Sequence, residues 1–204
     1  MKNVVAEDLQ RIVEIHIKAF PNFFMTQLGF CFLEKYYGLV LEYPGSIFIA
    51  VTQGDVIKGF VAGFLSPNEF YSLLKRKKLS FLSSVIVSAL RNPKLIIRIL
   101  YNLRRVNYMA NESDKSIVEL ASIAVDPQDS GKGFGKVLVK SFLEKARELR
   151  ADYVYLTTDS LNNDYVNKFY QALGFMLYKT FKTSPDRIMN EYRFYFKDYG
   201  NYNS

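Results

Sequence analysis

The sequence predicts a single domain of the α/β class that is built on a mixed sheet. Runs rich in β-branched and aromatic residues alternate with stretches whose apolar residues recur at helical spacing. Turns containing glycine or proline separate these runs, and no internal repeat or low-complexity segment interrupts their order. With 204 residues, about half of them apolar, the chain is long enough to bury one sizeable core. We therefore expect one domain over residues 1–204, with a basic helical insertion at about residues 66–115.

The N-terminal part predicts a short strand, two helices and a β-hairpin. Apolar side chains from Leu9 to Phe20 recur at helical spacing, and Pro21 ends that helix. A second helix is expected to stop before Pro44, and the turn around Gly54 joins two β-rich runs. The expected elements are a strand at 2–5, a helix from residue 7 to 20, a helix at about 24–41, and strands at 46–52 and 56–65.

The C-terminal part predicts strands and helices in alternation. An apolar run ends at Asp126-Pro127, a glycine-rich turn opens a helix, and a second strand and helix follow. The expected elements are a strand at 117–125, a helix at about 133–149, a strand at 153–158, a helix at about 164–173, and strands at 175–182 and 188–196. This alternation favours the mixed α/β class.

The net charge of +7 is concentrated between the third and fourth predicted strands. Residues 70–106 contain nine Lys or Arg residues and no acid, whereas the rest of the chain carries 18 basic and 20 acidic residues. Two apolar stripes predict a two-helix insertion, one helix at 79–90 and one that starts at Asn92-Pro93, with Arg98 and Arg105 on its opposite face. Either these helices pack on the core with a solvated charged face, or they meet an anionic partner, such as acceptor phosphates or an acidic membrane surface. Nucleic acid is not expected, because no binding motif accompanies the charge.

Cysteine and histidine occur once each. Cys31 excludes an internal disulfide and favours a reducing compartment, and its apolar neighbours predict a buried thiol. One histidine and one cysteine cannot supply a metal site. The N-terminus shows no secretory signal pattern, and no apolar run approaches the ~20 residues of a membrane span. We therefore expect a soluble cytoplasmic protein without a bound metal.

A glycine-rich turn that opens a helix is the strongest candidate for a binding site. The N–H groups at a helix N-terminus have no internal partner, and the helix dipole favours negative charge there. Three glycines let the backbone approach an anion closely, two lysines add positive charge, and the hydroxyl of Ser130 can cap the helix. The residues of this glycine turn are Ser130, Gly131, Lys132, Gly133, Phe134, Gly135 and Lys136. The chemistry indicates a pyrophosphate ligand, although a tight loop with no ligand is the alternative for the turn taken alone.

The glycine turn is one of two motifs that occur in a specific order. The first is a strand ending near V-x-P followed by [QR]-x-x-G-x-[GA], and the second is N-x-x-A-x-x-x-Y-x-x-x-G-F. The residues that match are Val125, Pro127, Gly133, Gly135, Asn163, Tyr170, Gly174 and Phe175. Ser130 stands where Arg or Gln is usual, which predicts weaker cofactor binding, and Val166 stands where Ala is usual. In this order the sequence resembles the GNAT superfamily of N-acetyltransferases over nearly the whole chain apart from the insertion.

The resemblance implies a GNAT-like acyl-CoA N-acyltransferase fold and acetyl-CoA as cosubstrate. The two-helix insertion between the third and fourth strands, read from the apolar stripes, is larger than GNAT enzymes usually have there. The resemblance assigns the pyrophosphate to the glycine turn. It also implies that the backbone of Ile123 and Val125 holds the pantetheine arm and polarises the acetyl carbonyl. Asn163 is expected to cap its helix and to hydrogen-bond the cofactor arm.

Three side chains are candidates for the chemistry. By resemblance Tyr170 protonates the coenzyme A sulfur, a task that suits a phenol that is neutral at physiological pH; a core aromatic is the alternative. Glu119 lies six positions before Val125, the offset at which some histone-type GNAT members carry a catalytic glutamate, so by resemblance it is the expected base, acting through water. A carboxylate in an apolar strand suits a position that faces a wet cleft; a solvated glutamate at an edge is the alternative. His16 lies on the apolar face of its helix, as a core histidine or as a residue that helps to bind or deprotonate the amine.

The sequence thus predicts an acetyl-CoA-dependent N-acetyltransferase that acts on a primary amine by direct transfer. The expected acceptor is a small molecule, a phosphate-bearing amino sugar, because a basic insertion is expected beside a cleft that already accepts an anionic cofactor. The alternative is a non-catalytic module of the same fold that binds acyl-CoA, suggested by Ser130.

Overall fold

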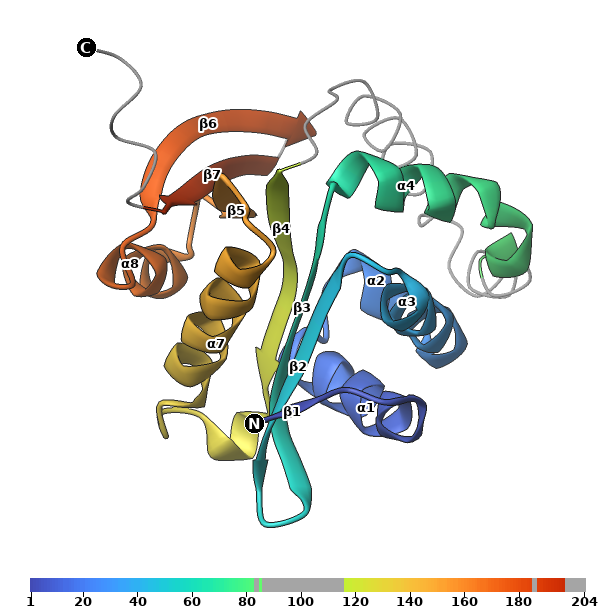
Figure 1. Ribbon diagram of the computed structural model, residues 1–204. Helices are drawn as coiled ribbons and strands as arrows, with labels where there is room; N and C mark the ends of the chain where they lie inside the picture. Colours follow the sequence, from blue (N-terminus) through green and yellow to red (C-terminus); the bar gives the residue numbers. More distant parts are fainter. Residues whose placement is uncertain (83–84, 86–115, 185–186, 197–204) are drawn as a thin grey trace.

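The structure is a computed structural model that describes residues 1–82, 85, 116–184 and 187–196. These residues form a seven-stranded sheet in the order β1-β2-β3-β4-β5-β7-β6, with helices on both faces (Figure 1). Neighbouring strands are antiparallel except β4 and β5, which are parallel. The mixed α/β class predicted from the sequence is therefore confirmed.

The strands follow the predicted order and nearly the predicted bounds. They are β1 Lys2–Asn3, β2 Ser46–Gln53, β3 Val56–Leu65, β4 Ile117–Val125, β5 Tyr153–Asp159, β6 Met176–Ser184 and β7 Arg187–Tyr195. β1 is shorter than expected, since it pairs with β2 only at Lys2 and Asn3. Gly54 closes the β2–β3 hairpin with a φ of 59°, a left-handed conformation that glycine adopts at no steric cost.

The helices lie in two layers, one on each face of the sheet (Figure 1). The helices are α1 Leu9–Ala19, α2 Phe24–Gln27, α3 Phe30–Glu42, α4 Pro67–Arg76, α7 Phe134–Glu148 and α8 Asp164–Ala172, with short 3₁₀ turns at Ala6–Asp8 and Pro127–Asp129. α1 and α3 pack with Phe48, Phe60 and Phe64 of the sheet in one buried cluster. α7 and α8 pack against the other face in a second cluster that contains Phe142 and Tyr170. The sheet is therefore covered on both sides, which suits its largely apolar central strands.

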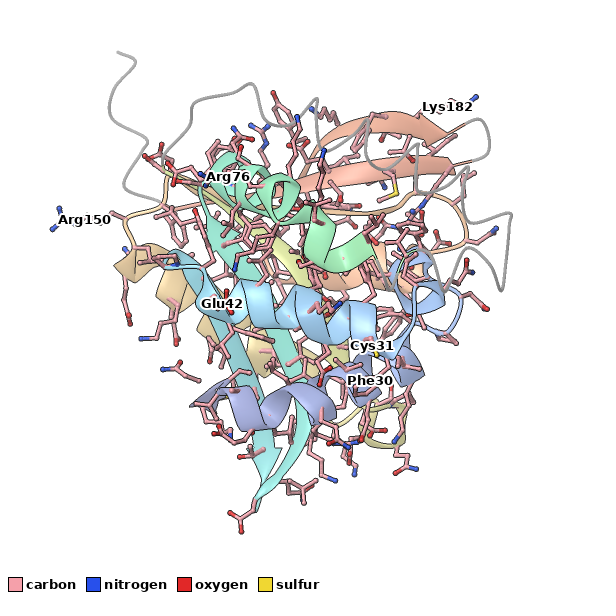
Figure 2. The ribbon with its side chains drawn as sticks, turned by 90° about the vertical axis from the view of Figure 1, so that its right-hand side faces the viewer. Phe30, Cys31, Glu42, Arg76, Arg150 and Lys182 are labelled. Atoms are coloured by element: carbon pink, nitrogen blue, oxygen red, sulfur yellow. The ribbon has the colours of Figure 1, made fainter. Side chains whose placement is uncertain are left out.

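The single helix expected at about 24–41 is two helices. Gly29 has a φ of 88°, which an α-helix cannot contain, and it separates α2 from α3. The break also corrects the expectation for Cys31, which is exposed on the first turn of α3 instead of buried. Figure 2 shows Phe30 and Cys31 together at one end of this helix.

The described part of the insertion packs on α3. Phe70 of α4 stacks on Phe64 with ring centroids 3.8 Å apart, and Lys77 forms an ion pair with Glu42 at 2.7 Å. Leu79, expected on an apolar stripe, is instead 75% exposed. The helix expected from Asn92-Pro93 onward, with Arg98 and Arg105, lies outside the described residues, as does most of the one at 79–90. Within the described part of the chain, no helix is long and apolar enough to cross a membrane.

Candidate active site

The candidate site lies where the two parallel strands β4 and β5 separate. They pair over only three positions, Ile117–Glu119 with Tyr153–Tyr155. Beyond this point β4 follows β3 as far as Val125, while β5 follows β7 as far as Asp159. A bulge at Ala121 shifts the register of β4 against β3, and a bulge bends a strand locally. The two strands therefore open like a V in the middle of the sheet.

A cleft of about 860 Å³ is lined by both arms of this V. The glycine turn except Lys132 lines it, as do His16, Ile123, Val125, Asn163 and Tyr170. Residues from positions 16 to 170 thus meet at one cavity, and eleven of the thirteen predicted site residues line it. The two that do not are Glu119 and Lys132.

The glycine turn presents open backbone to the cleft. Gly131 and Gly133 have φ values of 78° and 83°, and a Cβ added at either position would meet nothing within 4 Å. Gly133 is the N-cap of α7, so the first N–H groups of this 15-residue helix follow it directly. The helix therefore starts after Ser130, and the expectation that Ser130 caps it is wrong. The turn fits an anion, because left-handed glycines leave space in front of unpartnered N–H groups.

The charges around the glycine turn are partly neutralised by an aspartate. Asp129 accepts a hydrogen bond from Lys132 at 2.6 Å and forms an ion pair with Lys58 at 3.2 Å. The hydrogen bond from Lys132 lowers the pKa of Asp129 below its usual 3.8, against the opposing effect of burial and with further help from Lys58. Lys132 therefore faces Asp129, and Lys136 is the lysine of the turn that lines the cleft.

Tyr170 lies on α8 in the wall of the cleft. Its ring packs between Phe169 and Phe175, with centroids 5.2 and 5.6 Å away, and it is buried. Burial raises the pKa of the Tyr170 phenol well above its usual range, so the hydroxyl keeps its proton at neutral pH. The position combines both sequence interpretations, since Tyr170 is a core aromatic and also lines the cleft.

Asn163 is the N-cap of α8, as expected, but its side chain does not cap the helix. The amide donates instead to Thr158 Oγ1 at 2.7 Å and to the Asp159 carbonyl at 3.1 Å. Asn167 donates to the same carbonyl at 3.1 Å. These bonds tie the start of α8 to the end of β5, which fixes one arm of the V.

A second wall, which we call the α1 wall, is formed by His16, Phe20, Phe23 and Ser122. His16 points inward, as expected, and is 4% exposed; its Nδ1 lies 2.7 Å from the Tyr37 hydroxyl. That hydroxyl lies 2.9 Å from Ser122 Oγ on β4. Burial lowers the pKa of His16 to about 4, so its ring is neutral at neutral pH.

Glu119 lies at the point of the V and is buried, with 6% of its surface exposed. The hydroxyl of Tyr71 donates to both of its carboxylate oxygens at 3.1 and 3.0 Å, and Tyr155 donates to one of them at 2.8 Å. Burial and the negative charge of Glu119 raise the pKa of the Tyr155 phenol. The expected open position facing a wet cleft is therefore wrong, because the carboxylate is enclosed beside the wall rather than in it.

Sequence reasoning missed four residues of the site. Tyr37 and Ser122 complete the contacts of His16, whereas Asp159 and Arg187 form a bidentate pair at the cleft, with N–O distances of 2.6 and 3.2 Å. None of these residues belongs to a motif. An inward-facing tyrosine about two helical turns from a glycine break, or a serine within an apolar strand, is a signal too common to single out.

The sequence matches the acetyltransferase (GNAT) family over residues 9–175. Because this match covers most of the chain, the protein belongs to the GNAT family of acetyltransferases. It is an N-acetyltransferase of a family that uses acetyl-CoA as acyl donor, as the motifs predicted. Among curated proteins, none matches the sequence.

Solved structures with the same fold cover nearly all of the chain. One is the ribosomal-protein-alanine N-acetyltransferase from Brucella melitensis, with 14% identity, 96% of this chain and 98% of that chain covered, and a TM-score of 0.63. A second is the ribosomal-protein-S18-alanine N-acetyltransferase from Escherichia coli, with 12% identity, coverage of 95% and 91%, and a TM-score of 0.60. A third is the polyamine N-acetyltransferase from Drosophila melanogaster, with 15% identity, coverage of 96% and 98%, and a TM-score of 0.57. At these identities the likeness concerns the fold.

Proposed function

We propose that this enzyme transfers the acetyl group of acetyl-CoA directly to a primary amine bound in the cleft, with no covalent acyl-enzyme. The observation that carries the proposal is the shared cavity: the glycine turn, the bulged part of β4 and the protonated phenol of Tyr170 line one cleft. Bound acetyl-CoA supplies an acetyl thioester. In the proposal, the glycine turn and Lys136 hold the pyrophosphate, and the backbone of Ile123 and Val125, with Asn163, holds the arm.

Tyr170 is the proposed general acid. Direct transfer forms a bond between the amine nitrogen and the acetyl carbon and breaks the bond between that carbon and sulfur. The thiolate then needs a proton, and a phenol that burial keeps protonated can donate one.

Glu119 is the proposed base, acting through water. Its place at the point of the V supports this role, since its neighbours Leu120 and Leu156 line the cleft. The hydroxyls of Tyr71 and Tyr155 donate hydrogen bonds to the carboxylate and hold it in one orientation. In the proposal, a water molecule carries the proton from the cleft to this enclosed carboxylate.

The proposed acceptor is a phosphate-bearing amino sugar. Two features of the described cleft support it besides the basic insertion: Arg187 is a cation in the wall, and the rings of Phe20 and Phe23 offer apolar faces to a sugar. The guanidinium of Arg187 is held by Asp159, with 2.6 Å between Nε and Oδ1, and its centre lies 6.0 Å from the Phe23 ring. An arginine held in this way is oriented before an anion arrives.

Release of coenzyme A thiol tests the proposed function. Purified protein is mixed with acetyl-CoA and, separately, with glucosamine 6-phosphate, glucosamine, agmatine or a peptide with an N-terminal alanine. Catalytic thiol release with an amine supports direct transfer, and a preference for glucosamine 6-phosphate over glucosamine supports the acceptor class. Binding of acetyl-CoA with no turnover on any amine would favour the non-catalytic module. A Cys31→Ser variant is the matched control, because the exposed Cys31 thiol reacts with the same reagent.

A further inference from the structure

Three side chains from three elements form a buried hydrogen-bonded chain that ends at the cleft. His16 Nδ1 lies 2.7 Å from the Tyr37 hydroxyl, which lies 2.9 Å from Ser122 Oγ. At one end, Nε2 of His16 is buried and has no hydrogen-bond partner among the described residues. At the other end, Ser122 is half-buried and lines the cleft. Ser122 is thus the end of the chain that a substrate can reach.

The chain has a preferred direction. The Tyr37 hydroxyl has one proton and can donate it either to His16 or to Ser122. A phenol is a stronger acid than an alcohol, and a neutral imidazole nitrogen is a stronger base than a serine hydroxyl, which favours donation from Tyr37 to Nδ1. Since His16 is neutral, its single ring proton then lies on Nε2. Ser122 in turn donates to the Tyr37 oxygen, and its lone pairs remain for the cleft.

We propose that Ser122 Oγ accepts a hydrogen bond from an N–H of the attacking amine, and that Tyr37 and His16 are positioning residues that hold its lone pairs toward the cleft. The proposal rests on the proposed function, since it needs an amine in the cleft. No proton moves along the chain and no bond to the protein forms. The hydrogen bond orients the amine so that its own lone pair faces the acetyl carbon.

The place of Ser122 in β4 supports this role. It follows the bulge at Ala121 and precedes Ile123, one of the residues expected to hold the cofactor arm. Its hydroxyl faces the α1 side of the sheet, where it meets Tyr37 of α3. Ser122 is therefore the residue of the α1 wall that adjoins the strand segment expected to hold the cofactor arm. Direct contact between His16 and the amine is disfavoured by the same geometry, because Nε2 is buried.

The tautomer of His16 tests the direction of the chain without any acceptor. His16 is the only histidine, so labelling with ¹⁵N-histidine gives the signals of a single ring. At pH 7 we expect a neutral ring with the proton on Nε2 and a hydrogen-bonded Nδ1, and Tyr37→Phe should shift the Nδ1 resonance. A proton on Nδ1, or an imidazolium at pH 7, would overturn the proposal, since Ser122 would then face the cleft as a donor or the chain would be charged.

Kinetics test whether the three residues act as one unit. With the most reactive of the four amines named above, Ser122→Ala and Tyr37→Phe should each lower kcat/KM for the amine about 5- to 10-fold, the usual effect of one hydrogen bond, and leave the KM of acetyl-CoA unchanged. The double variant should be no worse than either single variant. Tyr43→Phe is the matched control, because it removes a buried hydroxyl that donates to Leu65 at 2.9 Å, away from the cleft.

Three results would contradict the proposal: unchanged kcat/KM in Ser122→Ala, losses that multiply in the double variant, or losses that appear equally in Tyr43→Phe. Failure of the proposed function looks different, because wild-type protein would then release no thiol with any amine. The tautomer measurement still decides the direction of the chain in that case.

Discussion

The glycine turn and the α1 wall face the same cleft but differ in how the chain builds them. The turn is one continuous segment, residues 130–136, and it offers mainly backbone N–H groups in front of open space. The α1 wall brings together His16 from α1 and Ser122 from β4, which Tyr37 of α3 links behind the wall, and it offers side chains to the cleft. A backbone site recognises an anion that many enzymes share, whereas a side-chain site can be changed residue by residue. In the proposed mechanism the glycine turn therefore holds the common cofactor, and the α1 wall selects the acceptor.

The largest expected effect concerns Tyr170, the proposed general acid. Tyr170→Phe should lower kcat by ~10²-fold or more, as expected for the loss of a general acid, while the Kd of acetyl-CoA stays nearly constant. Steady-state kinetics and calorimetric titration measure the two quantities. Unchanged kcat would show that another group protonates the thiolate. A weakened Kd would show instead that Tyr170 is needed to hold the cofactor.

A substitution in the glycine turn can remove anion binding there without changing any residue of the α1 wall. Gly133→Asp should abolish the rise in Tm that acetyl-CoA causes, because it places a negative charge in front of the helix N-terminus. Gly54→Asp is the matched control, since Gly54 also has a positive φ, 59°, and open space, but lies at the tip of the β2–β3 hairpin. If the Tm shift is lost in both variants, or in neither, the anion does not bind at the glycine turn.

His16, in the α1 wall, should make the free energy of unfolding depend on pH. His16 has a pKa of about 4 in the folded protein and 6.5 as a model value, so only the unfolded chain binds a proton between these values. Stability is therefore fully present above pH 6.5 and falls as the pH drops toward 4, by on the order of 3 kcal/mol. Denaturant unfolding of His16→Gln should lack this slope. Asp126 and Asp129, whose pKa values lie below 3.8, act in a more acidic window. An equal slope in the variant would assign the effect to other groups.

β3 and β4 approach each other closely at Gly63, beside Glu119. A Cβ on Gly63 would lie 2.0 Å from the Glu119 carbonyl oxygen and 2.5 Å from the Phe142 ring. Gly63→Ala should therefore lower the free energy of unfolding by about 1–3 kcal/mol. Gly38→Ala is the contrasting variant: its Cβ would meet only Leu9 at 3.9 Å, and alanine favours a helix, so stability should rise by up to ~1 kcal/mol. Equal losses in urea unfolding would argue against the packing at Gly63.

The contrast between features built from one continuous segment and features built from distant segments also explains how much the sequence could predict. The strand order, the glycine turn and Tyr170 were accessible because each depends on local periodicity or on motif spacing. The bulge at Ala121 and the enclosure of Glu119 were not, because each is decided by pairing with a distant segment. Glu119 shows this most clearly: its carboxylate is held by Tyr71 from the insertion and Tyr155 from β5, two residues that no spacing in the sequence connects.

Separate KM values for the two substrates test most directly whether the glycine turn binds acetyl-CoA and the α1 wall binds the amine. With acetyl-CoA and the most reactive amine of the panel, initial rates are measured for Gly133→Asp and Ser122→Ala. Gly133→Asp should raise the KM of acetyl-CoA and leave that of the amine within about twofold, whereas Ser122→Ala should lower kcat/KM for the amine and leave the KM of acetyl-CoA within about twofold. If both variants impair the same substrate, the glycine turn and the α1 wall form one site and the division proposed for the cleft is contradicted.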